Sequence, residues 1–332
     1  MINAKINHIE YYLPDKIVTN KDLAKENPDW NFDLIESKTG VLSRHVTTQN
    51  EHASLLAVRA AEKLLEKNNI DRKSIDTLLF CTQSPDYLLP TTACVIQERL
   101  KLPTTVAAFD FNLGCSGYIY GLAVAGSMMR AGISKRTLLL CADTYSKYIS
   151  PHDRTSRTIF GDGGTATLID LSKSDEALGP FVLGTDGKGR DKIIVRQKNN
   201  PAGVDFDSGI DLNQRLYVDG AAVFMFTMAK VPECVTELLA KAGKKIDDID
   251  LFVFHQASKI VIDKIVSKLS LNESKVFRGY EKIGNTVSAS IPIALKQAAE
   301  ESRLKNGDLI MLVGFGVGFS WGGCLVRWEG KS

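Results

Sequence analysis

Consecutive apolar residues mark four short stretches of the chain. They are TLLFC at 77–81, TLLLC at 137–141, LFVF at 251–254 and LIMLVGF at 309–315. Strands that are buried on both faces have this pattern, because helices cover both sides of a parallel sheet. The pattern therefore predicts a buried strand at each of the four stretches.

Helical periodicity fills much of the chain between these stretches. From Glu51 to Lys67, apolar residues recur at intervals of three and four, and charged residues occupy the opposite side. Another helix is predicted to end at Gly243, because glycine readily adopts the left-handed conformation that closes many helices. The alternation of strands and helices predicts an α/β fold.

The second half of the chain repeats features of the first. SIDTLLFCTQS at 74–84 aligns with DIDLFVFHQAS at 248–258, and each copy follows an amphipathic helix. FGDGGTATLI and FGVGFSWGGCLV, from Phe160 and Phe315, both place glycines before a predicted strand. These repeated segments predict a duplicated fold, with one half at 1–172 and the other at 173–332. Chance similarity between buried strands is the alternative explanation for either pair of similar segments taken alone.

Charge and composition are those of a globular protein. The 332 residues carry a formal net charge of +2 without charge blocks, so we expect neither nucleic acid nor a membrane as partner. No apolar run near the N-terminus is long enough for a secretion signal or a membrane span, and the expected location is cytoplasmic. The six cysteines form no CxxC pair, which argues against disulfides and against a metal site.

Three polar residues fall at predicted strand ends or helix starts, where the sites of α/β proteins gather. Cys115 lies between two glycines before an uncharged helix, His255 follows the LFVF strand, and Asn285 precedes a further helix. The positive end of a helix favours a thiolate, so we expect Cys115 to be an ionised nucleophile. The alternative for each residue is a structural role: Cys115 as an inert buried cysteine, His255 as a core histidine and Asn285 as a helix N-cap.

Two further interpretations of these motifs are weaker. The segment GFGVGFSWGG at 314–323 has GxGxxW in place of GxGxxG, and no crossover helix follows it, so it is not typical of a dinucleotide site. Its glycines can instead hold a backbone N–H against a developing oxyanion. The order Cys, His, Asn also occurs in papain-like proteases, but LGCSGY lacks the second cysteine and the aromatic residue of that family's motif.

Six motifs in order resemble those of the β-ketoacyl-acyl-carrier-protein synthase III family, within the thiolase-like superfamily. They are KTGVLSRHV (38–46), DFNLGCSGYIYGL (110–122), FGDGGTATLI (160–169), FVFHQAS (252–258), IGNTVSASIPIAL (283–295) and GFGVGFSWGGCLVRW (314–328). The resemblance covers essentially the whole chain. It implies a five-layer α-β-α-β-α fold built from two duplicated halves, normally as a homodimer.

The resemblance also implies roles for individual residues. Cys115 matches the nucleophile that accepts the acyl group, and His255 and Asn285 match the pair that binds the carbonyl of the second thioester. The backbone N–H groups of Cys115 and Val317 match the oxyanion donors. Four further residues match substrate-binding positions: Lys38, Leu89, Ser258 and Gly316.

The implied activity is acyl transfer to Cys115, followed by decarboxylative Claisen condensation with a malonyl thioester. Acyl-coenzyme A or an acyl carrier protein would supply the acyl group, and no metal or other cofactor is expected. One alternative is an acyltransferase of the same fold that passes the acyl group to an alcohol or amine. Another is a non-catalytic partner in a heterodimer. The presence of His255 and Asn285 favours condensation over both.

Five positions depart from the family pattern: Leu34, Met225, Ser258, Ile260 and Val317. Leu34 replaces a tryptophan that stacks on adenine, and Ser258 replaces an asparagine near the pantetheine arm. Met225 and Ile260 replace a lysine and an arginine that dock the carrier protein. Val317 replaces a glycine. These changes leave the acyl donor open. At Leu89 the family often has a bulky aromatic residue, so the leucine predicts room for an acyl chain longer than acetyl.

Overall fold

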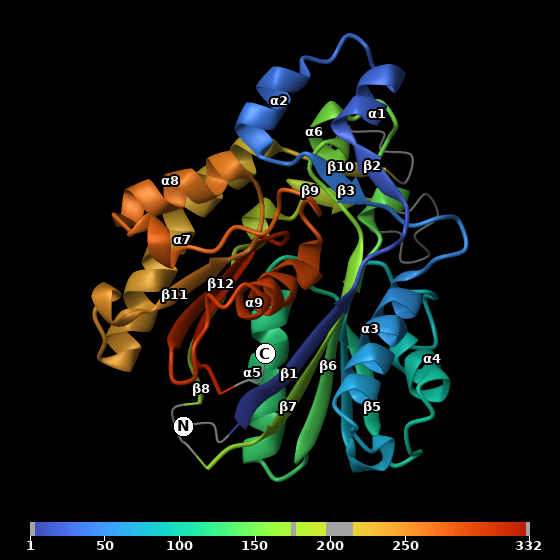
Figure 1. Cartoon of the computed structure of the whole chain (residues 1–332), viewed down its shortest axis with the longest axis vertical. Coiled ribbons are helices and arrows are strands. Elements are labelled where there is room, and N and C mark those ends of the chain that lie inside the picture. The colour runs from blue at the N-terminus through green and yellow to red at the C-terminus, as the bar shows by residue number, and fades with distance from the viewer. Residues whose placement is uncertain (1–3, 174–176, 197–214, 330–332) are drawn as a thin grey trace.

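The computed structural model describes residues 4–173, 177–196 and 215–329, and its strands form two large sheets (Figure 1). The first sheet has the order β1-β7-β6-β4-β5 and the second has the order β11-β12-β13-β8. The first contains β1 (Ala4–Tyr12), β4 (Thr77–Cys81), β5 (Ala107–Phe111), β6 (Arg136–Asp143) and β7 (Gly163–Leu171). The second contains β8 (Leu178–Thr185), β11 (Leu251–Phe254), β12 (Leu309–Gly316) and β13 (Ser320–Arg327).

Two short ribbons and the helices complete the described fold. The ribbons pair β2 (Ile17–Thr19) with β3 (Ser43–His45), and β9 (Ile193–Val195) with β10 (Leu216–Val218). The helices are α1 (Asn20–Glu26), α2 (Phe32–Thr39), α3 (Ala53–Lys67), α4 (Thr92–Arg99), α5 (Gly117–Arg130), α6 (Arg154–Arg157), α7 (Gly220–Ala242), α8 (Lys259–Leu269) and α9 (Ser290–Glu300).

The hydrophobic cores show how these elements stack in layers. On β4, Leu78 and Phe80 pack with the core of α3 and α4, whereas Leu79 and Cys81 pack with the core around α5 and α9. Strand β12 divides its side chains in the same way between that central core and the core of α7 and α8. The first sheet therefore lies between the outer layer of α3 and α4 and the central layer of α5 and α9, and the second sheet lies between that central layer and the outer layer of α7 and α8 (Figure 1). The predicted α-β-α-β-α order is confirmed.

The elements predicted from hydrophobic pattern are present. All four apolar stretches lie within strands, the helix expected from Glu51 begins at Ala53, and Gly243 closes α7 with a φ of 60°. Every strand of the first sheet ends by Leu171 and every strand of the second begins at Leu178 or later. The division into duplicated halves at 172 stays a prediction, and residues 174–176 beside that boundary lie outside the described residues.

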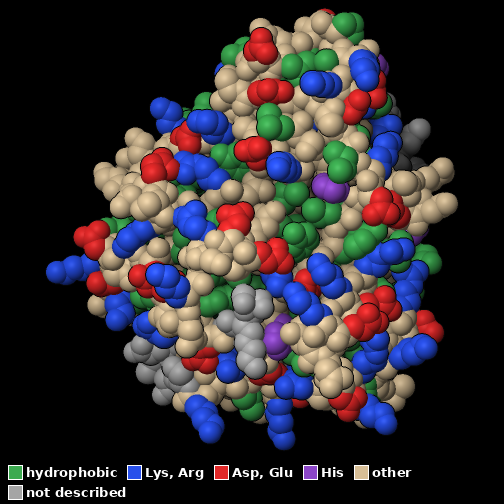
Figure 2. Space-filling model, viewed as in Figure 1, with side chains coloured by type: hydrophobic (Ala, Val, Ile, Leu, Met, Phe, Trp, Pro, Cys, Tyr) green, Lys and Arg blue, Asp and Glu red, His purple; other side chains and the backbone are tan. Residues whose placement is uncertain are grey.

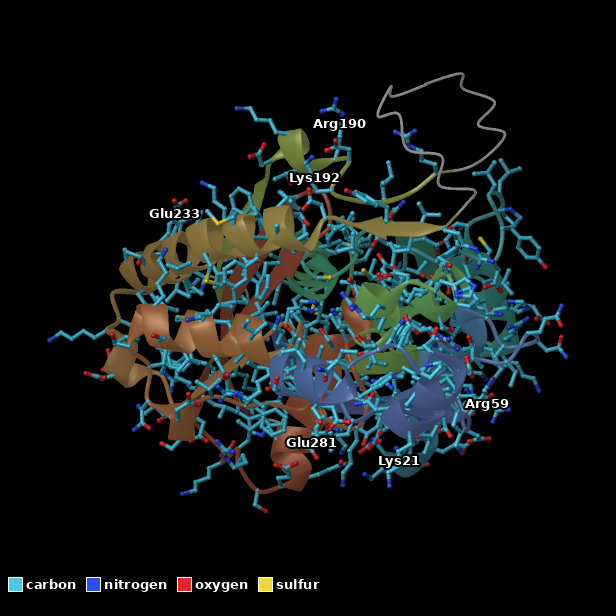
Figure 3. The ribbon with its side chains drawn as sticks, turned by 90° about the horizontal axis from the view of Figure 1, so that it is seen from above. Lys21, Arg59, Arg190, Lys192, Glu233 and Glu281 are labelled. Carbon is cyan, nitrogen blue, oxygen red and sulfur yellow. The ribbon has the colours of Figure 1, made fainter. Side chains whose placement is uncertain are left out.

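The surface carries charges of both signs. Cationic and anionic side chains are interspersed on the face shown in Figure 2. From above, Arg59 on α3 and Glu233 on α7 extend outward from the two outer helical layers (Figure 3). All six cysteines are free thiols. None of the described helices combines the length and the hydropathy needed to cross a lipid bilayer.

Candidate active site

Cys115 lies in the turn that leads into α5. The helix begins at Gly117 with Ser116 as its N-cap, and the Cys115 residue is only 7% exposed. Strand β12 approaches this turn very closely. A Cβ atom on Gly314 would lie 2.7 Å from the Cys115 carbonyl oxygen, and one on Gly316 would lie 2.8 Å from its Sγ. Glycine is therefore required at both positions to bring the second sheet against the thiol.

The Cys115 sulfur is a thiol in the resting protein. Burial and the negative charge of Asp143 raise the pKa of Cys115 to about 12. The backbone N–H groups of Val317 and of Cys115 itself, which are the predicted oxyanion donors, lower that pKa by a smaller amount. The expectation of an ionised sulfur is wrong, because the loss of hydration outweighs these dipoles. A base must take the proton before or during attack.

His255 follows directly after β11 and is buried. Its backbone N–H donates to the Val313 carbonyl of β12 at 2.8 Å, and its Nδ1 lies 2.6 Å from Ser290 Oγ at the start of α9. Burial lowers the pKa of the imidazole to about 3. His255 is therefore neutral at physiological pH, and Ser290 is a contact of the site that the motif comparison did not single out.

Asn285 is held by its own backbone and reaches His255 with its side chain. Its N–H donates to the Ile159 carbonyl at 2.9 Å, and its Oδ1 accepts from the Val287 N–H at 2.9 Å. The amide nitrogen therefore faces His255 Nε2, at 3.2 Å. Because that nitrogen donates, Nε2 accepts and the resting imidazole carries its proton on Nδ1, directed at Ser290. The N-cap alternative for Asn285 is wrong, because Thr286 caps the short helix at 287–289 and Ala289 caps α9.

One apolar cavity joins the three predicted catalytic residues. Cys115, His255 and Asn285 line a space of about 220 Å³, together with Phe224 of α7 and Val261 of α8. The cavity therefore runs between the second outer helical layer and the thiol. Such a channel suits a flexible arm that carries a thioester to a buried sulfur.

The other predicted substrate-binding residues divide into two pairs. Ser258 and Gly316 line the same cavity as Cys115. Lys38 is exposed in the last turn of α2, and Leu89 is 78% exposed in the loop before α4. Neither Lys38 nor Leu89 lines the cavity of the single chain, and the binding roles of all four residues stay predictions.

The departures from the family pattern give α2, α7 and α8 an apolar outer surface near the cavity. Leu34 is 50% exposed, Met225 is 69% exposed and Ile260, which also lines the cavity, is 41% exposed. The neighbouring Lys259 is paired with Asp263 at 2.5 Å. The positive charge at this position is therefore largely compensated.

Asp143 is a buried carboxyl group that the motifs did not reveal. It stands at the end of β6 and accepts from the Gln83 N–H at 2.7 Å and from the Ser288 N–H at 3.1 Å. The Ser288 hydroxyl donates to it as well. Burial raises the pKa of Asp143 to about 7. Asp143 thus ties the first sheet to the turn that carries Asn285 into α9.

Metal ligands were also sought within the described part of the chain. Over residues 4–173, 177–196 and 215–329, no group of three or more His, Cys, Asp or Glu side chains lies together in a way that could hold a metal ion.

Comparison with known proteins identifies the family. A model of the 3-oxoacyl-[acyl-carrier-protein] synthase III family matches residues 109–187, and a model of its C-terminal part matches residues 239–328. The β-ketoacyl-[acyl-carrier-protein] synthase III of Natranaerobius thermophilus is 35% identical over 334 residues, which cover 99% of this chain and 100% of that protein. The chain belongs to the β-ketoacyl-[acyl-carrier-protein] synthase III family.

Solved structures agree with this assignment to the synthase III family. One crystal structure of a 3-oxoacyl-(acyl-carrier-protein) synthase III is 42% identical and has a TM-score of 0.93, covering 98% of this chain and all of that one. A 3-oxoacyl-(acyl-carrier protein) synthase of Burkholderia xenovorans is 34% identical with a TM-score of 0.92, covering 98% of this chain and 93% of that one. The predicted thiolase-like fold and the predicted class of function, a condensing enzyme, are confirmed.

The protonation state of Cys115 is testable with an alkylating reagent. Because burial raises the pKa of the thiol to about 12, the reactive thiolate fraction should rise about tenfold per pH unit between pH 6 and pH 9. We expect the rate of Cys115 carbamidomethylation by iodoacetamide, followed by peptide mass spectrometry, to climb without levelling. A rate that levels off below pH 7 would show a resting thiolate instead. The exposed thiol of Cys94 serves as internal control for the reagent.

Proposed function

We propose that the protein joins an acyl group to a malonyl thioester in two half-reactions on one cavity. The observation that carries the proposal is the convergence of the Cys115 thiol, the His255 imidazole and the Asn285 amide on one apolar channel. A nucleophile and two hydrogen-bonding groups in a site shielded from water are the requirements of thioester condensation. Acyl-coenzyme A or an acyl carrier protein is the proposed donor.

In the first half-reaction, Cys115 attacks the carbonyl carbon of the acyl thioester. The neutral imidazole of His255 accepts the thiol proton as the carbon–sulfur bond forms, and passes it to the departing thiolate. The tetrahedral oxyanion accepts hydrogen bonds from the Cys115 and Val317 N–H groups. The products are acyl-Cys115 and a free thiol such as coenzyme A.

In the second half-reaction, the malonyl thioester occupies the same channel. Its carbon–carbon bond to the carboxylate breaks, CO₂ leaves, and the electron pair moves toward the thioester oxygen as an enolate. The Asn285 amide donates to that oxygen. His255 donates from Nε2 once its proton has moved to that nitrogen, and Ser290 can support this tautomer because a hydroxyl donates as well as accepts. The enolate carbon then attacks acyl-Cys115 and the carbon–sulfur bond breaks. The released Cys115 thiolate takes up one proton from solvent, which restores the resting thiol.

The neutral pair of His255 and Asn285 favours condensation over transfer to an alcohol. Burial holds the pKa of His255 at about 3, so the imidazole, which takes the thiol proton only as the carbon–sulfur bond forms, is too weak a base for the less acidic proton of a hydroxyl group. It is nevertheless a suitable partner for an enolate oxygen, which needs a hydrogen bond and not a full proton.

The test follows both half-reactions with a panel of acyl-coenzyme A and acyl-carrier thioesters. We expect intact-mass spectrometry to show one acyl group on the wild-type chain and none on Cys115→Ala. His255→Ala and Asn285→Ala should each lower CO₂ release from malonyl thioester by about 100-fold or more, since each removes one donor to the enolate oxygen. Cys94→Ala, which removes an exposed free thiol, is the matched control and should load normally.

Two results would contradict this function. If no thioester acylates Cys115, the result favours the alternative that the protein is a non-catalytic partner in a heterodimer. If loading succeeds but an added alcohol is acylated without CO₂ release, the acyl-cysteine is used for simple acyl transfer.

We also propose that two copies of the chain associate through β5. This strand is the edge of the first sheet and pairs only with β4 within the described part of the chain. It exposes Phe109 at 38%, and the neighbouring loop exposes Leu88 and Leu89 at 78% each. An uncovered edge with apolar side chains is a surface for pairing with a second strand, and a two-fold axis would pair β5 with its own copy. In such a dimer, Leu89 is placed to reach the other copy.

A charge on the β5 edge tests this association. In sedimentation equilibrium the wild-type protein should have twice the chain mass of 36.4 kDa. Phe109→Glu should lower the measured mass toward that of a single chain, because a buried carboxylate opposes pairing. Ile17→Glu places the same charge on another exposed apolar residue, on β2, and should leave the dimer intact. A wild-type protein that sediments as a single chain would overturn the proposal.

A further inference from the structure

Asp143 is a buried carboxyl group to which the two half-reactions proposed above assign no role. It is 0% exposed at the end of β6. Among the described residues its hydrogen-bond partners are Gln83 and Ser288, and neither is a cation. A carboxyl group without a positive partner is unfavourable in a protein interior. Burial first and then the charge of Asp143 raise the pKa of Cys115, so the group also opposes formation of the nucleophile. These two unfavourable effects indicate that Asp143 contributes something else to the site.

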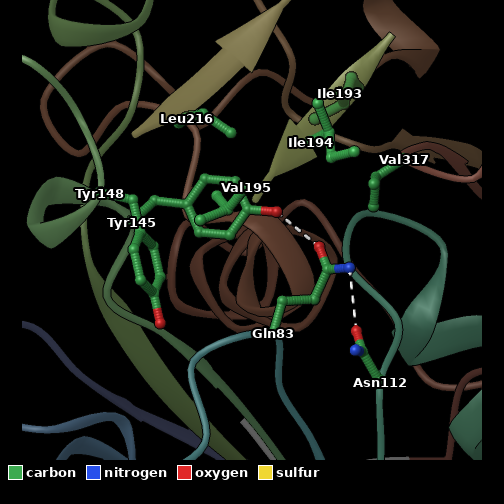
Figure 4. A pocket seen from close by; sticks show the side chains of 9 residues that line it. All are labelled: Gln83, Asn112, Tyr145, Tyr148, Ile193, Ile194, Val195, Leu216 and Val317. Atoms are coloured by element: carbon green, nitrogen blue, oxygen red, sulfur yellow. Dashed lines mark hydrogen bonds between the residues drawn. The ribbon is translucent and has the colours of Figure 1, made fainter. Parts of the chain in front are cut away.

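One oxygen of Asp143 is fixed by the segment after β4. Its Oδ1 accepts from the Gln83 N–H at 2.7 Å. Gln83 is fixed in turn, because its side-chain amide bonds to the Tyr145 hydroxyl at 2.5 Å and to the Asn112 amide at 3.0 Å. Figure 4 shows both bonds, in the wall of a second cavity of about 220 Å³. The carboxyl group therefore has a set position beside the turn at 286–289.

The other oxygen of Asp143 holds the turn at 286–289, which leads from Asn285 into α9. Its Oδ2 accepts from the Ser288 N–H at 3.1 Å and from the Ser288 hydroxyl at 2.5 Å. Among the described residues, these are the hydrogen bonds that join the turn to a part of the chain outside residues 285–300. The buried Thr286 hydroxyl has no hydrogen-bond partner among the same residues. Asp143 is therefore the polar anchor of this turn.

The anchored turn contains a backbone conformation that valine rarely adopts. Val287 has a φ of 55°, in the left-handed region that is unfavourable for a β-branched residue. In this conformation its N–H donates to Asn285 Oδ1 at 2.9 Å. That bond leaves the Asn285 Nδ2 facing His255 Nε2, at 3.2 Å. A strained residue persists only where its surroundings hold it, and the residue after Val287 is the one that Asp143 holds.

We propose that Asp143 is a positioning residue of the malonyl half-reaction, which acts through Ser288 and Val287 to direct the Asn285 N–H toward the enolate oxygen. The inference rests on the proposed function, since it requires that Asn285 donates during the loss of CO₂. The backbone oxyanion donors of the first half-reaction belong to other segments of the chain. A change at Asp143 should therefore slow the second half-reaction far more than the first.

The test measures both half-reactions in Asp143→Ala. We expect kcat for CO₂ release from malonyl thioester to fall about tenfold and KM to change less than about twofold, because a misdirected donor weakens the transition state more than substrate binding. Acyl loading of Cys115, followed by intact-mass spectrometry, should change less than about threefold and shows that the variant is folded. Ser288→Ala keeps the carboxyl group and removes one of its donors, so it should lower the same kcat about threefold.

A double-mutant cycle with Asn285→Ala separates positioning from general damage to the fold. If Asp143 acts through the Asn285 amide, Asp143→Ala should lower CO₂ release by less than about twofold in the Asn285→Ala background. The matched control is Asp76→Ala, which should keep the wild-type ratio of CO₂ release to acyl loading. Asp76 also accepts from a backbone N–H, that of Lys135 at 2.7 Å, and from a serine hydroxyl, that of Ser134 at 2.6 Å. It precedes β4, however, and so lies at the opposite end of the first sheet from Asp143.

Two results would overturn the inference. One is a loss of CO₂ release on Asp143→Ala that is equally large with and without the Asn285 amide. The other is an Asp143→Ala variant that loads an acyl group and releases CO₂ as fast as the wild-type protein. If Asp143→Ala does not fold, Ser288→Ala takes its place in the cycle and the same two results apply. A wild-type protein that loads no thioester, or loads one without releasing CO₂ from malonyl thioester, overturns the proposed function instead.

Discussion

The site depends on the close approach of β12 to the turn at Cys115. Gly314 and Gly316 leave no space for a Cβ between the second sheet and the nucleophile, and Ser116 adds a 2.7 Å hydrogen bond to Ser320 of β13. This contact brings the Val317 N–H to the sulfur and excludes water from it. The same packing that supplies the oxyanion donors therefore raises the pKa of the thiol, and the two effects are inseparable.

Burial gives each group of the site a defined resting state. Cys115 remains a thiol and His255 remains a neutral imidazole, because water cannot hydrate a thiolate or an imidazolium at these buried positions. Asn285 cannot rotate freely, since Val287 holds its oxygen, so the direction of its N–H bond is set before substrate arrives. Hydrogen-bond donors arranged in advance need little reorganisation as charge develops, which is the advantage of a buried site over an exposed one.

The apolar pattern of the sequence was sufficient for the buried strands, whereas the order of the layers and the three groups that line the cavity came from the resemblance of its motifs to the synthase III family. Runs such as 77–81 are apolar at every position because both faces of the strand are covered, and that pattern is local. The ionisation of Cys115 was not predictable, because it depends on desolvation by residues far away in the chain and on the charge of Asp143. A second cavity, whose lining includes Gln83 and Val317, was equally hidden, since its walls meet only after the two sheets pack.

A crystal structure of the protein with a short acyl group on Cys115 and coenzyme A bound would test the account most directly. Its central claim is that Cys115, His255 and Asn285 act on both thioesters from one cavity. The account predicts density for the acyl group bonded to the Cys115 sulfur, with its carbonyl oxygen at the Val317 N–H, and for the pantetheine arm beside His255 and Asn285. A Cys115 sulfur that carries no acyl group, or a pantetheine arm that lies away from His255 and Asn285, would contradict it.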